Sequence, residues 1–430
     1  MSSSFTPPGN VVAPVVEAAT APGQIVGFIL QNAGTTTLAA QSVTLNEVFA
    51  PGAVPQGSGL TVTIDGVTYP AQLDAKTFNP DGSVASGIVT IDAPAIAAGT
   101  SVSAMLNLAP ASTAPAVNLA SALANYSLTA ALDITANQGG SIGSQTIDIA
   151  GAIRSALAAG TAQTWLSGPL ASEAIVSIPV SGSLRIEADV TAYANGQVST
   201  TLQFNNDAAM QANGGTITYS ATVIQNGVTV AQQLNLTQYQ YQDWSLSTGT
   251  TPSAAGLNVQ HDIAYLEATG AIPNYDTQYG VPSNNIASEA ASVAAPGWNS
   301  PLGTDGITQY MPMTGGRADI GPTTQGNATW LITQNGAAAS FALGQATEAG
   351  SVPWHFYDPT SNGTFLNTAD YANIWTDPRG GPSSYTTGLT QQVSSNTGWA
   401  TDTAHMPDLN YVSYMLTGNV QALEQLNAQA

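Results

Sequence analysis

The scarce histidines and the aromatic side chains in the last third of the chain are the residues whose types and spacing could do chemistry. The chain has three histidines and five Lys plus Arg among 430 residues. In "GSVPWHFYDPTSNG" (350–363), His355 stands between Trp354 and Phe356, and Tyr357 follows. Because aromatic rings stack on the apolar faces of sugars, Trp354 and Tyr357 suit a glycan platform, with His355 as a hydrogen-bonding or proton-transfer group. The alternative is that these four bulky side chains fill a gap between consecutive helices.

A basic side chain stands close to a carboxylate at two other places. Arg317 and Asp319 share the stretch "GGRADIG", where the arginine either recognises a substrate carboxylate or forms a structural ion pair that holds the loop. Asp402 and His405 lie three residues apart in "ATDTAHMPDLNY", a spacing that lets a carboxylate orient an imidazole or that caps a following helix. A lyase acting on a uronic acid must neutralise the substrate carboxylate and remove the adjacent proton, and Arg and His suit these two tasks.

His261 precedes Asp262 at the start of a predicted helix. An aspartate at a helix start is explained by capping and by the helix dipole, so His261 is either a polar neighbour or a binding residue. Arg379 is the remaining basic residue of this third. We take as candidate catalytic residues His355, His405 and Arg317, and as candidate substrate-binding residues Trp354, Tyr357, His261, Asp319 and Asp402.

The sequence predicts no cofactor and no metal site. It contains no cysteine, no EF-hand loop and no His-Glu-x-x-His motif. P-loop, dinucleotide-binding and nucleophile-elbow motifs are also missing from the sequence. Calcium is a weaker alternative, because aspartate and asparagine are abundant in the predicted loops.

The charge balance excludes some partners. Twenty-six acidic residues face five basic ones, and the formal net charge is −21. Such a surface repels phosphate backbones, so we expect no nucleic-acid partner. No apolar run approaches the length of a transmembrane helix, so we expect no membrane insertion. Because only 7% of the residues are charged, solubility must come from hydroxyl and amide side chains, a composition typical of exported bacterial surface proteins.

The residue patterns that predict secondary structure change along the chain. Residues 1–24 are rich in Pro, Ala and Val and predict an extended arm. Residues 25–112 alternate apolar and polar residues over short runs, with an Asp-Gly hairpin turn in "IDGV", and predict a small β domain. Residues 118–250 contain longer alternating runs with Asn-Gly turns and predict a β-sandwich, with a helix over 149–160.

Residues 256–430 favour helices. "TTQGNATWLITQNGAAASFALGQATEAG" predicts two helical pieces that break near Asn335-Gly336. "MPDLNYVSYMLTG" and "NVQALEQLNAQA" predict a final pair, with Asp408 near the first start and Gly418 at its end. Helix pairs joined by aromatic loops would gather the candidate side chains on one side.

The segment 46–84 resembles the opening barrel of rhamnogalacturonan exolyase-like proteins. The matching positions are a Phe-x-x-Gly-x-x-Pro entry, a Pro-x-Gln strand and an Asp-Gly-Ser turn, here Phe49, Gly52, Pro55, Pro70, Gln72, Asp81, Gly82 and Ser83. Later stretches also look like uncharacterised bacterial and phage-associated proteins of this layout. The resemblance implies a small β-barrel, then a β-sandwich and then an α/α toroid. The residue patterns along the chain predict the same order. The stretch after Gly256 is shorter than a full toroid requires.

These observations favour recognition over catalysis. We expect an extracellular, cell-surface or virion-associated protein that binds a polysaccharide or cell-surface glycan, or that assembles structurally there. A polysaccharide lyase or hydrolase acting on acidic polysaccharide is one alternative. A self-assembling surface-layer or fibre subunit is another, and a homo-oligomer or larger assembly is expected.

Overall fold

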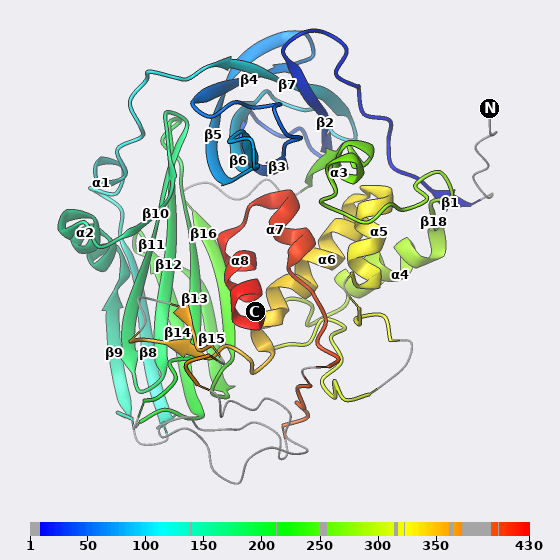
Figure 1. Ribbon diagram of the computed structural model, residues 1–430. Helices are drawn as coiled ribbons and strands as arrows, with labels where there is room; N and C mark the ends of the chain where they lie inside the picture. The colour runs from blue at the N-terminus through cyan, green and yellow to red at the C-terminus, as the bar shows by residue number, and fades with distance from the viewer. Residues whose placement is uncertain are drawn as a thin grey trace.

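The computed structural model describes residues 9–430 except 138–139, 212, 250–255, 314–316, 322, 361–363, 368, 372–396 and 403. Arg379 and residues 1–8 of the predicted arm therefore lie outside the described residues. The molecule is mostly β, with a barrel-like sheet at the top, two long sheets at the left and helices at the right (Figure 1).

The barrel-like sheet is antiparallel and nearly closed. Its strand order is β17-β2-β7-β4-β5-β6-β3, with β2 (Gln24–Asn32), β3 (Gln41–Val48), β4 (Ser58–Ile64), β5 (Val67–Phe78), β6 (Val84–Ala93), β7 (Ser101–Pro110) and β17 (Leu257–His261). Asp65 and Gly66 join β4 to β5 with φ of 48° and 79°, which confirms the predicted hairpin turn. Strand β17 comes from beyond residue 256, so this sheet includes residues from the helical third.

Two further sheets face each other across one hydrophobic cluster. The first has the order β15-β14-β8-β9, with β8 (Leu128–Asn137), β9 (Gly143–Asp148), β14 (Ile217–Gln225) and β15 (Val228–Gln238). The second has the order β10-β11-β12-β13-β16, with β10 (Gln163–Ser167), β11 (Ala171–Ser181), β12 (Leu184–Tyr193), β13 (Val198–Asn206) and β16 (Asp243–Gly249). Their shared core includes Phe204 stacked on Trp244, with ring centroids 4.3 Å apart. Helix α1 (Leu119–Ala122) and the predicted helix, α2 (Ile149–Ala159), pack against this core, with α2 in contact with β8 and β11.

The last third is largely helical among its described residues. It contains α3 (Ile263–Thr269), α4 (Ser283–Val293), α5 (Gln325–Thr333), α6 (Gly336–Glu348), a 3-10 turn (Ala349–Ser351), α7 (Tyr411–Thr417) and α8 (Val420–Gln429). The break between α5 and α6 is confirmed: Gln334 has a φ of 51°, and the Asn335 side chain accepts a hydrogen bond from the Ala337 N–H at 2.9 Å. None of the described helices is long and apolar enough to cross a membrane.

One predicted helix start is wrong. His261 ends strand β17, where it pairs with Phe28 of β2, and helix α3 begins only at Ile263. Asp262 does cap this helix, because its side chain accepts a hydrogen bond from the Tyr265 N–H at 3.1 Å. Helix α4 had no sequence prediction, and no side chain caps its start at Pro282.

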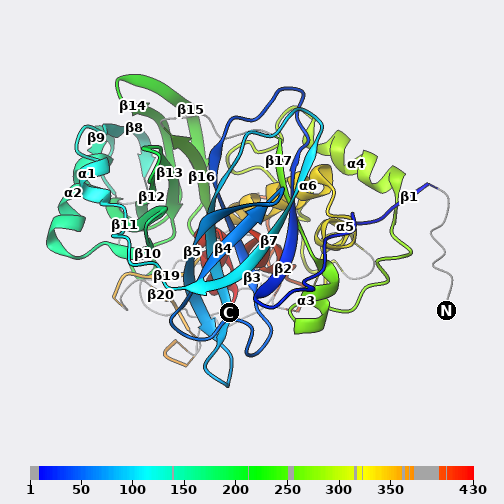
Figure 2. The ribbon, with the colours of Figure 1, turned by 90° about the horizontal axis from the view of Figure 1, so that it is seen from above.

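Short strands connect distant parts of the chain. Strand β1 (Asn10–Val11) pairs with β18 (Val281–Pro282), which places this short piece of the predicted arm beside α4. Strand β19 (Tyr357–Asp358) pairs with β20 (Thr364–Phe365). Seen from above, the barrel-like sheet covers α7 and α8 between the long sheets and the other helices (Figure 2). The assignments as β-sandwich and α/α toroid are not confirmed by these elements and stay predictions.

Candidate functional site

Four of the predicted site residues come together in one loop region. The guanidinium of Arg317 donates to the carbonyls of Met311 at 2.5 Å and His405 at 2.5 Å, and its Nε lies 3.1 Å from Asp319 Oδ1. His405 Nδ1 lies 2.6 Å from Asp402 Oδ2. Arg317 is therefore occupied in joining two loops, which agrees with the structural alternative for this residue.

Asp319 is likewise engaged within the loop. Its Oδ2 accepts a hydrogen bond from the Thr308 N–H at 2.7 Å, and its Oδ1 accepts one from the Thr308 hydroxyl at 3.0 Å. The His405 side chain is 27% exposed, so it is the accessible member of this group. Within the described residues, no group of three or more His, Cys, Asp or Glu side chains is arranged to hold a metal ion.

The predicted platform at Trp354 and His355 is buried. Each residue is 1% exposed, and Trp354 packs in a cluster with Val352, Trp399 and other apolar side chains. The Trp354 Nε1 lies 3.1 Å from His355 Nε2, and His355 Nδ1 lies 3.0 Å from the Tyr241 carbonyl oxygen. This burial differs from the open platform that we predicted, and it matches the alternative of aromatic side chains that fill a gap.

Tyr357, in the same aromatic run, lines a cavity. Strand β19 carries it across the outer face of strand β12, where the Arg185 guanidinium carbon lies 3.9 Å from the centre of its ring. The cavity beside it has a volume of about 520 Å³, within the range of about 300–1,000 Å³ that is usual for small-molecule sites. We call it the aromatic cavity; its walls are Gln163, Trp165, Arg185, Glu187, Tyr357, Thr364, Phe365, Leu366, Asn367, Val420, Leu423, Glu424, Asn427 and Ala430.

Alternation along strand β12 positions the charged wall of the aromatic cavity. Leu184 and Ile186 point into the core between the two long sheets, so Arg185 and Glu187 point to the opposite face. Helix α8 lies against that face and brings Glu424 to the same place. The cavity is thus built from a sheet, a helix and a short hairpin.

Buried ion pairs occupy the guanidinium group of Arg185. It donates to the two carboxylate oxygens of Asp207 at 2.9 and 2.8 Å and to Glu187 Oε2 at 2.5 Å. All three residues are buried. A guanidinium that already binds two carboxylates has little capacity to neutralise a third one on a ligand.

Two carboxyl groups of the aromatic cavity have opposite pKa shifts. Burial, reinforced by the neighbouring Glu187 carboxylate, raises the pKa of Glu424 well above its ordinary value. Burial alone would also raise the pKa of Glu187, but the adjacent Arg185 and a hydrogen bond with Glu424 lower it. Gln203 Nε2 donates to Glu424 Oε2 at 2.7 Å and lies 3.4 Å from Glu187 Oε1. Glu424 is therefore the less acidic member of the pair and loses its proton after Glu187.

This pair has the wrong spacing for glycoside hydrolysis. The two carboxyl groups are hydrogen-bonded to each other. Glycoside hydrolases hold their two carboxyl groups about 5 Å or more apart, to leave room for the sugar carbon or for a water molecule. The aromatic cavity therefore offers aromatic faces, amides and a fixed hydrogen-bonding pair, which suit binding.

Sequence reasoning missed most of this cavity. It named Tyr357 but not Trp165, Arg185, Glu187 or Glu424. A usable signal was present in "LRIEADV", where charged residues alternate with apolar ones in a chain that has only five Lys plus Arg. Such alternation places the charges on the second face of a strand that is buried on its first face.

His261 lies apart from both regions, at a separate cavity beneath the barrel-like sheet.

No protein-family model matches the chain, and no curated protein matches it significantly. The resemblance to rhamnogalacturonan exolyase-like proteins therefore stays a prediction.

Proposed function

We propose that this protein recognises neutral glycans through the aromatic cavity. The observation that carries the proposal is the combination, in one cavity of about 520 Å³, of the aromatic side chains Trp165, Tyr357 and Phe365 with the amides of Gln163, Asn367 and Asn427. Sugar rings offer apolar faces for stacking and hydroxyl groups for hydrogen bonds, and these walls supply both kinds of partner.

Neutral glycans fit this cavity better than acidic ones. Arg185 is occupied by Asp207 and Glu187, and Glu187 adds a negative charge to the wall. A uronate would face that charge without a free cation, and the net charge of −21 adds repulsion at longer range. The lyase alternative depends on Arg317 and His405. The guanidinium of Arg317, however, is engaged by loop carbonyls and Asp319.

We place this function at a carbohydrate-covered surface, extracellular, on the cell or on a virion, with the protein in a homo-oligomer or larger assembly. The low proportion of charged residues, 7%, supports this location, because it is typical of exported bacterial surface proteins. In this proposal the two facing sheets are a β-sandwich, and the helices of the last third belong to an α/α toroid-like domain.

Isothermal titration calorimetry with neutral hexasaccharides and with oligogalacturonate tests the proposal. We expect binding of a neutral glycan, and about tenfold weaker binding by Tyr357→Ala, because stacking is lost. Asn427→Ala, at an exposed position of α8, should also weaken binding without affecting the fold. The matched control is Tyr279→Ala, an exposed tyrosine outside the cavity walls. Absence of binding to every neutral glycan, or equal losses in Tyr279→Ala and Tyr357→Ala, contradicts the proposal.

Strand β15 favours a second function, self-assembly. It is an edge strand, and Val228 and Leu234 are each 65% exposed on it. Strands β14 and β15 contain no charged residue, so two copies could pair along β15 without like-charge repulsion. Sedimentation velocity should show an assembly of the native protein that is lost in Leu234→Lys. The control is Phe78→Lys, at an exposed position on the barrel-like sheet, which should leave the assembly intact. A monomeric native protein contradicts this second function.

A further inference from the structure

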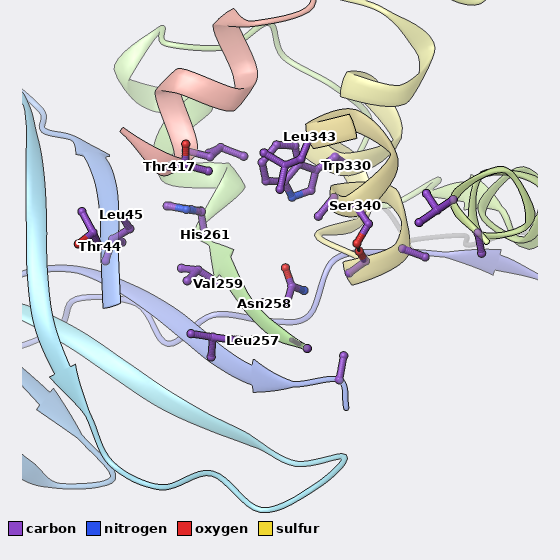
Figure 3. A pocket seen from close by; sticks show the side chains of 18 residues that line it. Thr44, Leu45, Leu257, Asn258, Val259, His261, Trp330, Ser340, Leu343 and Thr417 are labelled. Carbon is purple, nitrogen blue, oxygen red and sulfur yellow. Dashed lines mark hydrogen bonds between the residues drawn. The ribbon is translucent and has the colours of Figure 1, made fainter. Parts of the chain in front are cut away.

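A second cavity lies where the barrel-like sheet meets the helices (Figure 3). Its volume is about 440 Å³, again within the usual range for small-molecule sites. We call it the interface cavity; its walls include strands β3 and β17 and helices α4 to α7. It shares no lining residue with the aromatic cavity.

Small and apolar residues line most of the interface cavity. Leucine and valine side chains come from both sides, and the helices contribute alanines where larger residues would fill the space: Leu45, Leu257, Val259, Ala290, Val293, Ala337, Ala339, Leu343 and Leu416. An apolar wall of this kind favours the apolar part of a ligand, because burial removes that surface from water.

Buried polar atoms without a hydrogen-bond partner lie at the wall of the same cavity, in His261 and Trp330, and next to it, in Glu47. His261 and Trp330 both line it, and the nitrogen atoms His261 Nδ1 and Trp330 Nε1 are buried with no hydrogen-bond partner among the described residues. Glu47 Oε2, also buried and without a hydrogen bond, lies 3.6 Å from His261 Nδ1. Figure 3 shows His261 between Leu45 and Thr417, on the side of the cavity opposite Trp330. Buried polar atoms are normally paired, and because His261 Nδ1 and Glu47 Oε2 face each other, Trp330 Nε1 is the buried donor that points to a missing partner.

We propose that the interface cavity binds an uncharged, mainly apolar molecule that carries a hydroxyl group. The indole N–H of Trp330 can only donate, so its partner on a ligand must be an acceptor such as a hydroxyl oxygen, and the nearby Glu47 gives the opposite, His261 side of the cavity an acidic character. A carboxylate or phosphate head would face Glu47 without a cation. An ammonium head only donates, so it would leave the indole N–H unpaired and would lose its own hydration in an apolar space.

Three probes with one chain length and different heads, 1-octanol, octanoate and octylamine, test this assignment. We expect 1-octanol to bind at least tenfold more tightly than octanoate or octylamine in calorimetry. It should also shift the indole N–H resonance of Trp330, which is assigned by its loss in Trp330→Phe. The same variant should bind 1-octanol about fivefold more weakly, because the ligand loses one hydrogen bond but keeps the apolar wall.

A pair of neighbouring substitutions on α4 shows where the probe binds. Ala290 is half-buried and lines the interface cavity, whereas Ala291 is exposed and does not. Ala290→Leu should fill the space and abolish 1-octanol binding, and Ala291→Leu should leave it unchanged. If Trp330→Phe does not fold, these two variants still test whether 1-octanol binds in the interface cavity. The proposal is overturned if the native protein does not bind 1-octanol, if octanoate binds equally well, or if Ala290→Leu binds like the native protein.

Discussion

Strand β12 presents two faces that are buried by different means. On one face, Ile186 lies in the apolar core between the long sheets and is 0% exposed. On the other face, Arg185 is also buried, but among Asp207, Glu187 and the half-buried Glu424 of α8. Adjacent residues of one strand thus show that burial alone does not define a core. The apolar face is stabilised by removal from water, whereas the polar face depends on ion pairs and on the contact between the Glu187 and Glu424 carboxyl groups.

The largest effect is expected on the polar face, from Arg185→Ala. It leaves the buried carboxyl groups of Asp207 and Glu187 without their cation, so the free energy of unfolding should fall by about 3–5 kcal/mol at pH 7. Urea unfolding at pH 7 and pH 4 measures this loss. The loss should be smaller at pH 4, because protonation relieves the uncompensated charges; an equal loss at both pH values would contradict the role of the ion pairs.

A smaller, pH-dependent effect is expected from Glu424→Gln. The pKa of Glu424 is raised in the folded protein, so the folded state holds a proton that the unfolded state releases above its ordinary pKa of 4.5. The contribution of Glu424 to stability is therefore complete below that value and is lost as the pH rises toward the raised pKa. In the native protein this lowers the free energy of unfolding by up to about 1.4 kcal/mol per pH unit. Glu424→Gln should abolish this loss.

Unfolding measured at intervals between pH 5 and pH 8 checks the Glu424 prediction. The glutamine keeps the shape and can still accept the hydrogen bond from Gln203. We expect the variant to gain stability relative to the native protein as the pH rises. A parallel pH dependence of the two proteins would show that Glu424 and Glu187 do not share a proton.

The smallest effect is expected on the apolar face, from Ile186→Val. Loss of one buried methylene should lower the free energy of unfolding by about 0.5–1.5 kcal/mol. This loss should be the same at pH 5 and pH 8, since Ile186 packs among apolar side chains. A pH-dependent loss would mean that the two faces of β12 are coupled through the strand.

The elements that the sequence predicts well have local signals. The Asp65-Gly66 turn, the break at Asn335-Gly336 and the end of α7 at Gly418 each depend on a few adjacent residues, and all three are present. The aromatic run 354–357 also has a strong local signal, but its chemistry is the same in a core and at a binding surface. Only the neighbours that the fold supplies distinguish the buried Trp354 from Tyr357.

The candidate site could not be predicted because its parts are distant in the sequence. Gln203 and Glu424 are 221 residues apart, and no local pattern pairs them. Histidine and tryptophan are concentrated in the last third of the chain, whereas the buried charges of the cavity lie on a strand of the middle third. His261 and Glu47 are also far apart in the sequence, and they meet only because β17 joins the barrel-like sheet.

Strand β17 has a consequence for how the chain is made. It pairs with β2, so the edge of the first sheet stays uncovered on the ribosome until the segment after residue 256 has emerged. An uncovered edge can recruit strands from neighbouring nascent chains. Truncation before Leu257 should therefore yield an aggregation-prone fragment, and pairings between such distant segments slow folding.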